Sequence, residues 1–304
     1  MDTLLQNLLN GLATGAMYSL IALGYTMVYG ILKLINFAHG DVFMIGAFVG
    51  YYGVRWMRTL QGGEQLEPSM GLFALILVAA VVVCSILGYL NERIAYRPLR
   101  NSPRIASLIT AIGVAFFLEF GGQLLFGPDP KFYPTLIDKS LYQWGAISFS
   151  SYQIIIIVLA VATMAALQYI IYGTKFGKAM RAVSYNFESA SLMGIPTDRV
   201  IAITFIVGSA VAGVGATLWG LYYAKLEPLM GIMPGLKAFV AAVLGGIGNV
   251  PGAMVGGLII GIVESLVAGS RFSMYKDGLA FLILIGILLF RPAGLFGRFE
   301  TEKV

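Results

Sequence analysis

The sequence predicts an all-α polytopic membrane protein with about eight or more transmembrane helices and two interrupted segments. Composition is the first observation: hydrophobic residues make up 58% of the 304 positions and charged residues 12%, against ~25% charged in an ordinary soluble domain. The second is that long charge-free runs recur along the chain. The third is that the stretch 153–159 is continuously apolar, without the alternation of a barrel strand. These observations exclude a soluble enzyme, a disordered chain and a disulfide scaffold.

The charge-free runs give the candidate spans in chain order. They are 3–32, 42–54, 68–91, 105–118, 140–174, 200–224, 238–263 and 278–290. The first run is too long for one span, whereas 42–54 and 278–290 are short. Within 140–174, Trp144, Gly145 and the serines up to Ser151 indicate an interfacial loop that precedes a helix at about 152–172.

Basic residues predict the orientation of the chain. They are densest in the loops 91–104 and 173–199, which we expect on the cytoplasmic side with the C-terminal tail. The loop 127–150 has balanced charge and is expected outside. Positive-inside topology also explains the net charge of +5 without any nucleic-acid partner. For successive spans to begin and end on the expected sides, the stretch 236–270 must enter the membrane and return. It must therefore bend near its middle.

Two segments interrupt the apolar runs, one at 33–41 and one at 244–252, where Gly and Pro favour a bend. A pair of interrupted segments in the two halves of a transporter indicates the permeation path. Non-helical backbone at membrane depth is tolerated only when it is buried in protein or lines a watery cavity. A plain cytoplasmic turn and close packing of glycines stay open as alternatives. The candidate path residues are Asn36, Phe37, His39, Gly40, Asp41, Gly245, Gly246, Gly248 and Asn249.

His39 is the only histidine of the chain. A metal site is not expected because no second histidine and only Cys84 are present to join it. The favoured hypothesis is a structural hydrogen bond or a role in the path. A proton relay with Asp41, Glu119 and Glu264 and a solvated turn at the membrane surface are the other two.

The loop 173–199 is predicted to hold one short amphipathic helix over 177–194. Apolar residues recur from Met180 to Ala190 at spacings of three and four, and Gly194 before Pro196 marks the end of the helix. Such a helix lies on lipid or docks into another subunit. The candidate docking residues are Lys178, Arg181, Val183, Phe187, Glu188 and Gly194.

Nucleotide chemistry is not expected in this chain. The segment 173–178 has one residue too few between its glycines for a phosphate-binding loop and lacks the following Ser or Thr. The glycines at 246 and 248 do not have the spacing of a dinucleotide fingerprint. We therefore expect no enzyme activity and no cofactor.

Several strings of the sequence resemble the permease subunits of branched-chain amino acid ABC importers, the LivH type. The resemblance covers essentially the whole chain. The strings that carry it are GYTMVYGI (24–31), INFAHG (35–40), MIG (44–46), ERIAYRPLR (92–100), GIPTDRVIA (194–202), KAF (237–239) and AAVLGGIG (241–248).

The resemblance implies one permease domain, 1–304, with the ABC-importer permease fold in the bacterial inner membrane. It implies a second homologous permease subunit, two cytoplasmic ATPase subunits and a periplasmic binding protein that delivers Leu, Ile or Val. It makes 177–194 the coupling helix and implies alternating access driven by ATP. A permease for urea or short amides is the nearest alternative, and a proton-coupled secondary transporter is the alternative from another class.

Overall fold

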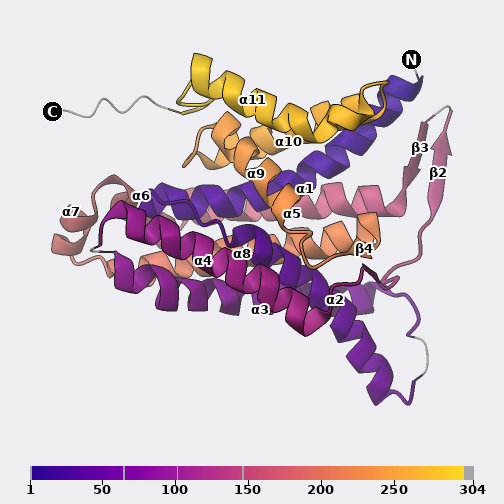
Figure 1. Cartoon of the computed structure of the whole chain (residues 1–304), viewed down its shortest axis with the longest axis horizontal. Coiled ribbons are helices and arrows are strands. Elements are labelled where there is room, and N and C mark those ends of the chain that lie inside the picture. The colour runs from indigo at the N-terminus through magenta and orange to yellow at the C-terminus, as the bar shows by residue number, and fades with distance from the viewer. Residues whose placement is uncertain (1, 64–65, 101, 146, 298–304) are drawn as a thin grey trace.

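A computed structural model of the chain describes residues 2–63, 66–100, 102–145 and 147–297 (Figure 1). Within these residues, seven helical stretches are long and apolar enough to cross a membrane. They are Thr3–Leu32, Met70–Leu99, Ile105–Phe126, Ser151–Gly173, Thr197–Tyr223, Val250–Ala268 and Ser273–Phe290. A shorter apolar helix, Ile232–Gly245, joins them. The all-α polytopic fold is therefore as the sequence predicts.

Helix α1 (Asp2–Leu32) is the central element of the fold. Its 31 residues form one uninterrupted helix, which is longer than a single span needs. At 1.5 Å per residue it is ~46 Å long. Glycines at 11 and 15 bring its backbone against α10, which is its most extensive contact. The helix is buried by α8 and α10 on its flanks.

Two of the next three helices are longer than their charge-free runs, and the third lies within its run, 68–91. Helix α2 spans His39–Leu60, α3 spans Met70–Leu90, and α4 spans Arg104–Phe126. A π turn, η1 (Asn91–Tyr96), and a 3-10 turn, η2 (Arg97–Leu99), join α3 to α4. Helix α4 continues past Glu119 because one charged residue shortens an apolar run without ending a helix.

Four short strands lie outside the helices in the part of the chain that the structure describes. Strand β1 (Lys131–Phe132) pairs with β4 (Lys225–Leu226), and β2 (Leu141–Trp144) pairs with β3 (Ile147–Ser150), both antiparallel. The sequence predicts only a loop at 144–151, so the β2–β3 hairpin is a correction. Helix α5 (Ser151–Gly173) follows directly, and a reciprocal cap between Ser150 and Gln153 fixes its start.

The predicted single helix over 177–194 is two helices, α6 (Lys175–Tyr185) and α7 (Phe187–Leu192). Asn186 between them is extended, and its side-chain oxygen accepts a 2.8 Å hydrogen bond from the Ser189 amide. That cap starts a new helix where the apolar spacing alone indicates continuity. Gly194, at φ +81°, ends the segment as predicted, and α8 (Thr197–Tyr223) follows.

The last part of the chain contains α9 (Ile232–Gly245), α10 (Val250–Ala268), the 3-10 turn η3 (Ser273–Tyr275) and α11 (Lys276–Phe290). Helices α9 and α10 run antiparallel, since Gly245 contacts Gly252 and Ala241 contacts Gly256. The predicted entry and return of this stretch is confirmed. Figure 1 places α6 and α7 at one end of the molecule, here called the basic end, and β2–β3 at the opposite hairpin end.

Candidate functional site

The first interruption, residues 33–38, brings the chain back into the helix bundle. Helix α1 ends at Leu32, and α2 begins beside the middle part of α1, as Figure 1 shows. The His39 ring lies against Gly24, eight residues before Leu32. At 1.5 Å per residue, the first turn of α2 is therefore ~12 Å inside the basic end of α1. This depth fits the predicted break inside the membrane.

The starts of α2 and α9 meet backbone to backbone. A Cβ atom on Gly40 would lie 2.6 Å from the carbonyl oxygen of Gly231, and one on Gly235 would lie 3.2 Å from the Gly40 Cα. Neither helix has a side-chain cap at its N-terminus. Two helix N-termini, each with a partial positive charge, therefore face one region at membrane depth.

A cavity of 160 Å³ lies at this junction, between α1, α2, α4 and α9. It contains two carboxylates, Asp41 on the first turn of α2 and Glu119 on α4. Its remaining lining is apolar or small. These residues are Tyr25, Phe37, Gly40, Ile112, Ala115, Phe116, Gly231, Ile232, Gly235 and Leu236. The cavity thus combines acidic groups, helix N-termini and apolar walls.

His39 is buried, so the hypothesis of a solvated turn is wrong for this residue. Its ring packs edge-on against Tyr25 at 4.9 Å between centroids, and the absence of a side chain at Gly24 leaves room for it. Among the described residues, its Nε2 atom has no hydrogen-bond partner. Asn36 is also buried, while Phe37 reaches the cavity.

Glu264 lies in a separate ion cluster and does not line the cavity. Lys237 of α9 donates to Glu264 of α10 at 2.7 Å and to Asp277 of α11 at 2.6 Å. The hydroxyl of Tyr18 on α1 donates to the other oxygen of Glu264 at 2.8 Å. The hypothetical relay through Asp41, Glu119 and Glu264 is therefore not assembled, because Glu264 is already paired with a buried lysine.

The second interruption lies elsewhere, at the basic end. Gly245 packs directly on Gly252, and Gly248 approaches Gly30 near the end of α1. The segment 293–297 covers the break: the amide of Leu295 donates to the Leu244 carbonyl at 2.8 Å. Asn249 caps α10 by accepting from the Gly252 amide at 3.0 Å. The structure does not bring Gly245, Gly246, Gly248 and Asn249 to the cavity.

The glycines opposite Gly40 that the sequence does not indicate lie at the start of α9, at its N-cap and in its first turn. Gly231 and Gly235 lie opposite Gly40 in the cavity wall. The sequence suggests Gly246 and Gly248 for this position. A signal was present, because Pro234 stands in the first turn of α9, where proline is tolerated, whereas it is unfavourable in a helix interior. The predicted span 238–263 begins six residues after the first residue of α9, so it leaves out Pro234.

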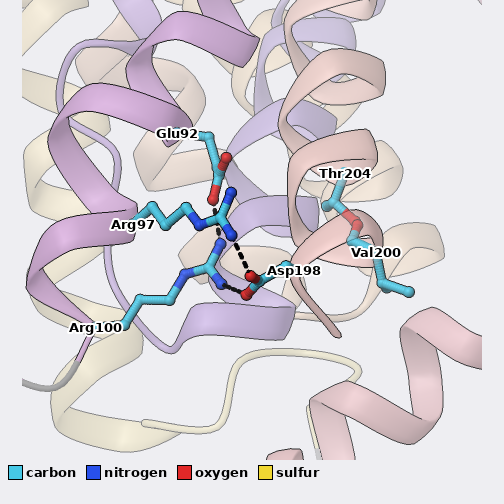
Figure 2. Close-up of polar contacts among 6 residues, drawn as sticks. All are labelled: Glu92, Arg97, Arg100, Asp198, Val200 and Thr204. Atoms are coloured by element: carbon cyan, nitrogen blue, oxygen red, sulfur yellow. Dashed lines mark hydrogen bonds and ion pairs between the residues drawn. The ribbon is translucent and has the colours of Figure 1, made fainter. Parts of the chain in front are cut away.

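An ion cluster at the basic end connects η1 and η2 with the start of α8 (Figure 2). Arg97 and Arg100 both donate to Asp198, and Arg100 also donates to Glu92. Figure 2 shows the two guanidinium groups side by side between the two carboxylates. The strings at 92–100 and 194–202, far apart in sequence, are therefore joined in space.

The same turn reaches the first interruption. Asn91 donates to the side-chain oxygen of Asn36 at 3.2 Å, and the Tyr96 hydroxyl donates to it at 3.3 Å. The Tyr96 hydroxyl also lies 3.3 Å from the Ile35 carbonyl oxygen. Asn36 is thus held by both ends of η1. Arg97 of η2, which directly follows η1, binds Asp198.

The predicted docking residues divide into two groups. Lys178, Phe187 and Glu188 are exposed at the basic end, whereas Val183 is buried against the bundle. Arg181 donates to the carbonyl of Ile171 and lies 5.2 Å from the Tyr172 ring centroid, so its side chain caps the C-terminus of α5. The most exposed apolar side chains here are Tyr185, Leu192 and Met193, none of which is among the predicted docking residues.

Metal binding has no support among the described residues, where no three His, Cys, Asp or Glu side chains come together in a suitable group.

Comparison with known proteins identifies the family. The family described as branched-chain amino acid transport system / permease component matches residues 7–288. The chain belongs to this family. It is thus a multi-pass membrane component of a transport system, and it is not itself an enzyme. The secondary-transporter alternative is excluded by this membership.

Individual relatives agree over nearly the full length. The high-affinity branched-chain amino acid transport system permease protein LivH of Salmonella typhimurium is 42% identical over 304 residues, 99% of this chain and 97% of the relative. LivH of Escherichia coli K12 is 43% identical with the same coverage. The Pseudomonas aeruginosa permease protein BraD is 43% identical, covering 99% of this chain and 98% of the relative.

Proposed function

We propose that this chain forms part of the translocation path for Leu, Ile and Val in an ATP-driven importer of the bacterial inner membrane. The observation that carries the proposal is the cavity where the N-termini of α2 and α9 meet beside Asp41. Irregular backbone at this depth requires a buried or watery environment, and the cavity supplies it. The full-length relatives named as branched-chain amino acid permeases support the substrate class.

The chemistry of the cavity matches each part of an amino acid. The substrate carboxylate binds at the positive N-termini beside Gly40 and Gly231. The ammonium group faces Asp41 or Glu119, and the branched side chain lies against the apolar wall. That wall includes Phe37, Ile112, Phe116 and Leu236. Urea and short amides carry no charge, so they make less use of the two carboxylates and are the second candidate.

The partners are a homologous permease, two cytoplasmic ATPase subunits and a periplasmic binding protein. The α6–α7 segment is the coupling element that docks into an ATPase subunit. Its exposed side chains at the basic end, Tyr185, Phe187 and Leu192, have the apolar character that such a contact buries, and Lys178 and Glu188 flank them. Val183 and Arg181 serve the attachment of the segment to the bundle.

Movement of the coupling segment reaches the cavity through the polar contacts of η1 and η2. Asp198 follows the coupling segment and binds Arg97 and Arg100, while Asn91 and Tyr96 of η1 bind Asn36. Asn36 lies three residues before His39, where α2 begins. In this proposal the second interruption, Gly245 to Asn249, closes the cytoplasmic side in one state of alternating access.

The test is transport by the assembled complex. The chain is purified with its co-assembling subunits, reconstituted in vesicles, and supplied with ATP and the binding protein. Leu, Ile and Val are expected to accumulate and to stimulate ATP hydrolysis. Stimulation by urea or an amide in place of these amino acids would reject the substrate class, and amino-acid uptake without ATP would reject the mechanism.

A further inference from the structure

A second and larger cavity lies at the basic end of the molecule. Its volume is 500 Å³, within the ~300–1,000 Å³ of usual small-molecule sites. One wall is the end of α3 with η1 and η2, and the other is the segment from the end of α7 to the start of α8. No residue of this cavity also lines the cavity of Asp41, so the proposed path gives this space no role.

The charged side chains around this space leave one positive charge uncompensated. Its charged lining consists of Glu92, Arg97, Asp198 and Arg199. Arg100 donates to both carboxylates, and Figure 2 shows it beside Arg97, so these two arginines balance the two acids. Arg199 is exposed and forms no ion pair within the described residues. Three guanidinium groups against two carboxylates favour a ligand with one negative charge.

The start of α8 adds to this positive potential. Pro196 precedes the helix without providing a side-chain cap, and Thr197 in the cavity wall is its first residue. The first amides of this 27-residue helix therefore lack intrahelical partners and carry a partial positive charge. Amides at a helix start and guanidinium groups are both strong partners of phosphate oxygens.

The apolar surface next to the cavity lies at membrane depth. Tyr89 lines the cavity ten residues before the end of the Met70–Leu99 span, which is ~15 Å along a helix. Ile86, three residues before it on α3, is 53% exposed, and Ile203, four residues after Arg199 on α8, is 40% exposed. Residues three or four apart share a helix face, and α3 packs along α8. A ligand with a charged head and an apolar chain therefore matches both surfaces.

We propose that this cavity binds the phosphate group of a membrane phospholipid, with Arg97, Arg199 and the start of α8 around the phosphate and the acyl chains beside Ile86 and Ile203. A phosphodiester carries one negative charge, which neutralises the charge that the ion cluster leaves. Basic pockets between transmembrane helices hold phospholipid headgroups in this way. A free phosphate ion offers the same oxygens but makes no use of the apolar surface. The site is separate from the substrate path and does not depend on the substrate class.

A phospholipid at this position bridges the two elements that Asp198 already joins. Arg97 belongs to η2 and Arg199 to α8, so a phosphate bound to both adds a contact across the same junction. In the proposed function, on which this consequence rests, the junction carries motion from the coupling segment to Asn36. Loss of the lipid is therefore expected to lower the ratio of uptake to ATP hydrolysis.

Photolabelling of the whole complex tests the site. The complex is reconstituted in phosphatidylethanolamine vesicles with a trace of phosphatidylglycerol that carries a diazirine on its acyl chain near the glycerol. Illumination attaches the probe to neighbouring side chains, and mass spectrometry identifies the labelled segments. The matched probe is a diacylglycerol with the same diazirine chain, which lacks the phosphate-containing headgroup.

The segments that contain Ile86 and Ile203 are expected to be labelled about tenfold more strongly by the phospholipid than by the diacylglycerol. This labelling is expected to fall about tenfold in Arg199→Gln, as for loss of a charged hydrogen bond. Arg93→Gln is the matched control, because Arg93 is an exposed arginine of η1 that does not line the cavity. Equal labelling by the two probes, an equal loss in both variants, or labelling of an ATPase subunit in place of this chain overturns the proposal.

Inorganic phosphate distinguishes the lipid from a free ion. In large excess it is expected to leave the labelling unchanged, whereas displacement of the probe would assign the cavity to free phosphate and overturn the lipid assignment. Arg199→Lys keeps the charge, so it is expected to be labelled more strongly than Arg199→Gln. If Arg199→Gln does not assemble, the comparison of the two probes on the parent complex decides by itself.

Discussion

The two ends of α9 show how similar sequence patterns serve different structures. At the N-terminus, Gly231 and Gly235 meet Gly40 at membrane depth, beside an open cavity and two carboxylates. At the C-terminus, Gly245 packs on Gly252 and the segment 293–297 covers the turn. Glycines pack backbone against backbone at both ends, but only the N-terminal contact borders a cavity with carboxylates, whereas the C-terminal contact is sealed.

The largest effect is expected at the sealed end. Gly245→Leu would place its side chain on the Gly252 carbonyl, where only backbone is available to move. We expect the folded chain to be lost from the membrane fraction. The measurement is size-exclusion chromatography of the membrane fraction after it is solubilised in detergent. Gly278→Leu is the control, because a Cβ at Gly278 meets nothing within 4 Å. Normal folding of Gly245→Leu would contradict the description of this end as a backbone seal.

The sequence is sufficient for the all-α membrane class and for the second break, whereas seven long apolar helices and one shorter one are described against about eight or more expected spans. Charge-free runs locate the long helices, and parity together with Gly and Pro predicts the bend between α9 and α10. Helix ends are less predictable, because single charged residues such as Glu119 interrupt an apolar run without ending the helix. The division of 177–194 depends on the Asn186 cap, which apolar spacing does not detect.

The candidate site is only half predictable from the sequence. Residues 36–41 are found because they interrupt a span, and His39 and Asp41 are polar within it. Their partner across the cavity, Gly231, lies outside every charge-free run and is brought there by the return of the chain after β4. Pairing of the two helix starts is a long-range contact, and no local pattern encodes it.

The middle of α9 is the next most sensitive place, because Lys237 fixes the helix between its two ends. Lys237→Met leaves the partly buried Glu264 without its cation, and loss of one partner of a buried pair costs up to about 3–5 kcal/mol. We expect a lower thermal unfolding temperature of the purified complex. Adding Glu264→Gln should recover much of the loss, since the uncompensated charge is gone. Equal unfolding temperatures of Lys237→Met and the parent chain would show that the cluster does not hold α9.

A smaller effect, confined to transport, is expected at the open end. Asp41→Asn keeps the size of the side chain and removes its charge, so folding and assembly should persist. Uptake of Leu should fall about tenfold or more, as for loss of a charged hydrogen bond. Uptake per assembled complex is the measurement, and Asp129→Asn in an exposed loop is the control. Unchanged uptake would remove Asp41 from the path.

The smallest effect is expected at the link between the coupling segment and the open end. Asp198 is 48% exposed and Arg97 is 39% exposed, and exposed ion pairs contribute only ~0–1 kcal/mol. Asp198→Asn should therefore leave stability nearly unchanged while it loosens η2 from α8. If this contact transmits the motion, the ratio of uptake to ATP hydrolysis falls by up to about fivefold. Combining Asp198→Asn with Asn36→Ala distinguishes a shared route from two separate ones, because losses on one route do not add. Additive losses in that double variant would show that Asn36 and Asp198 act independently.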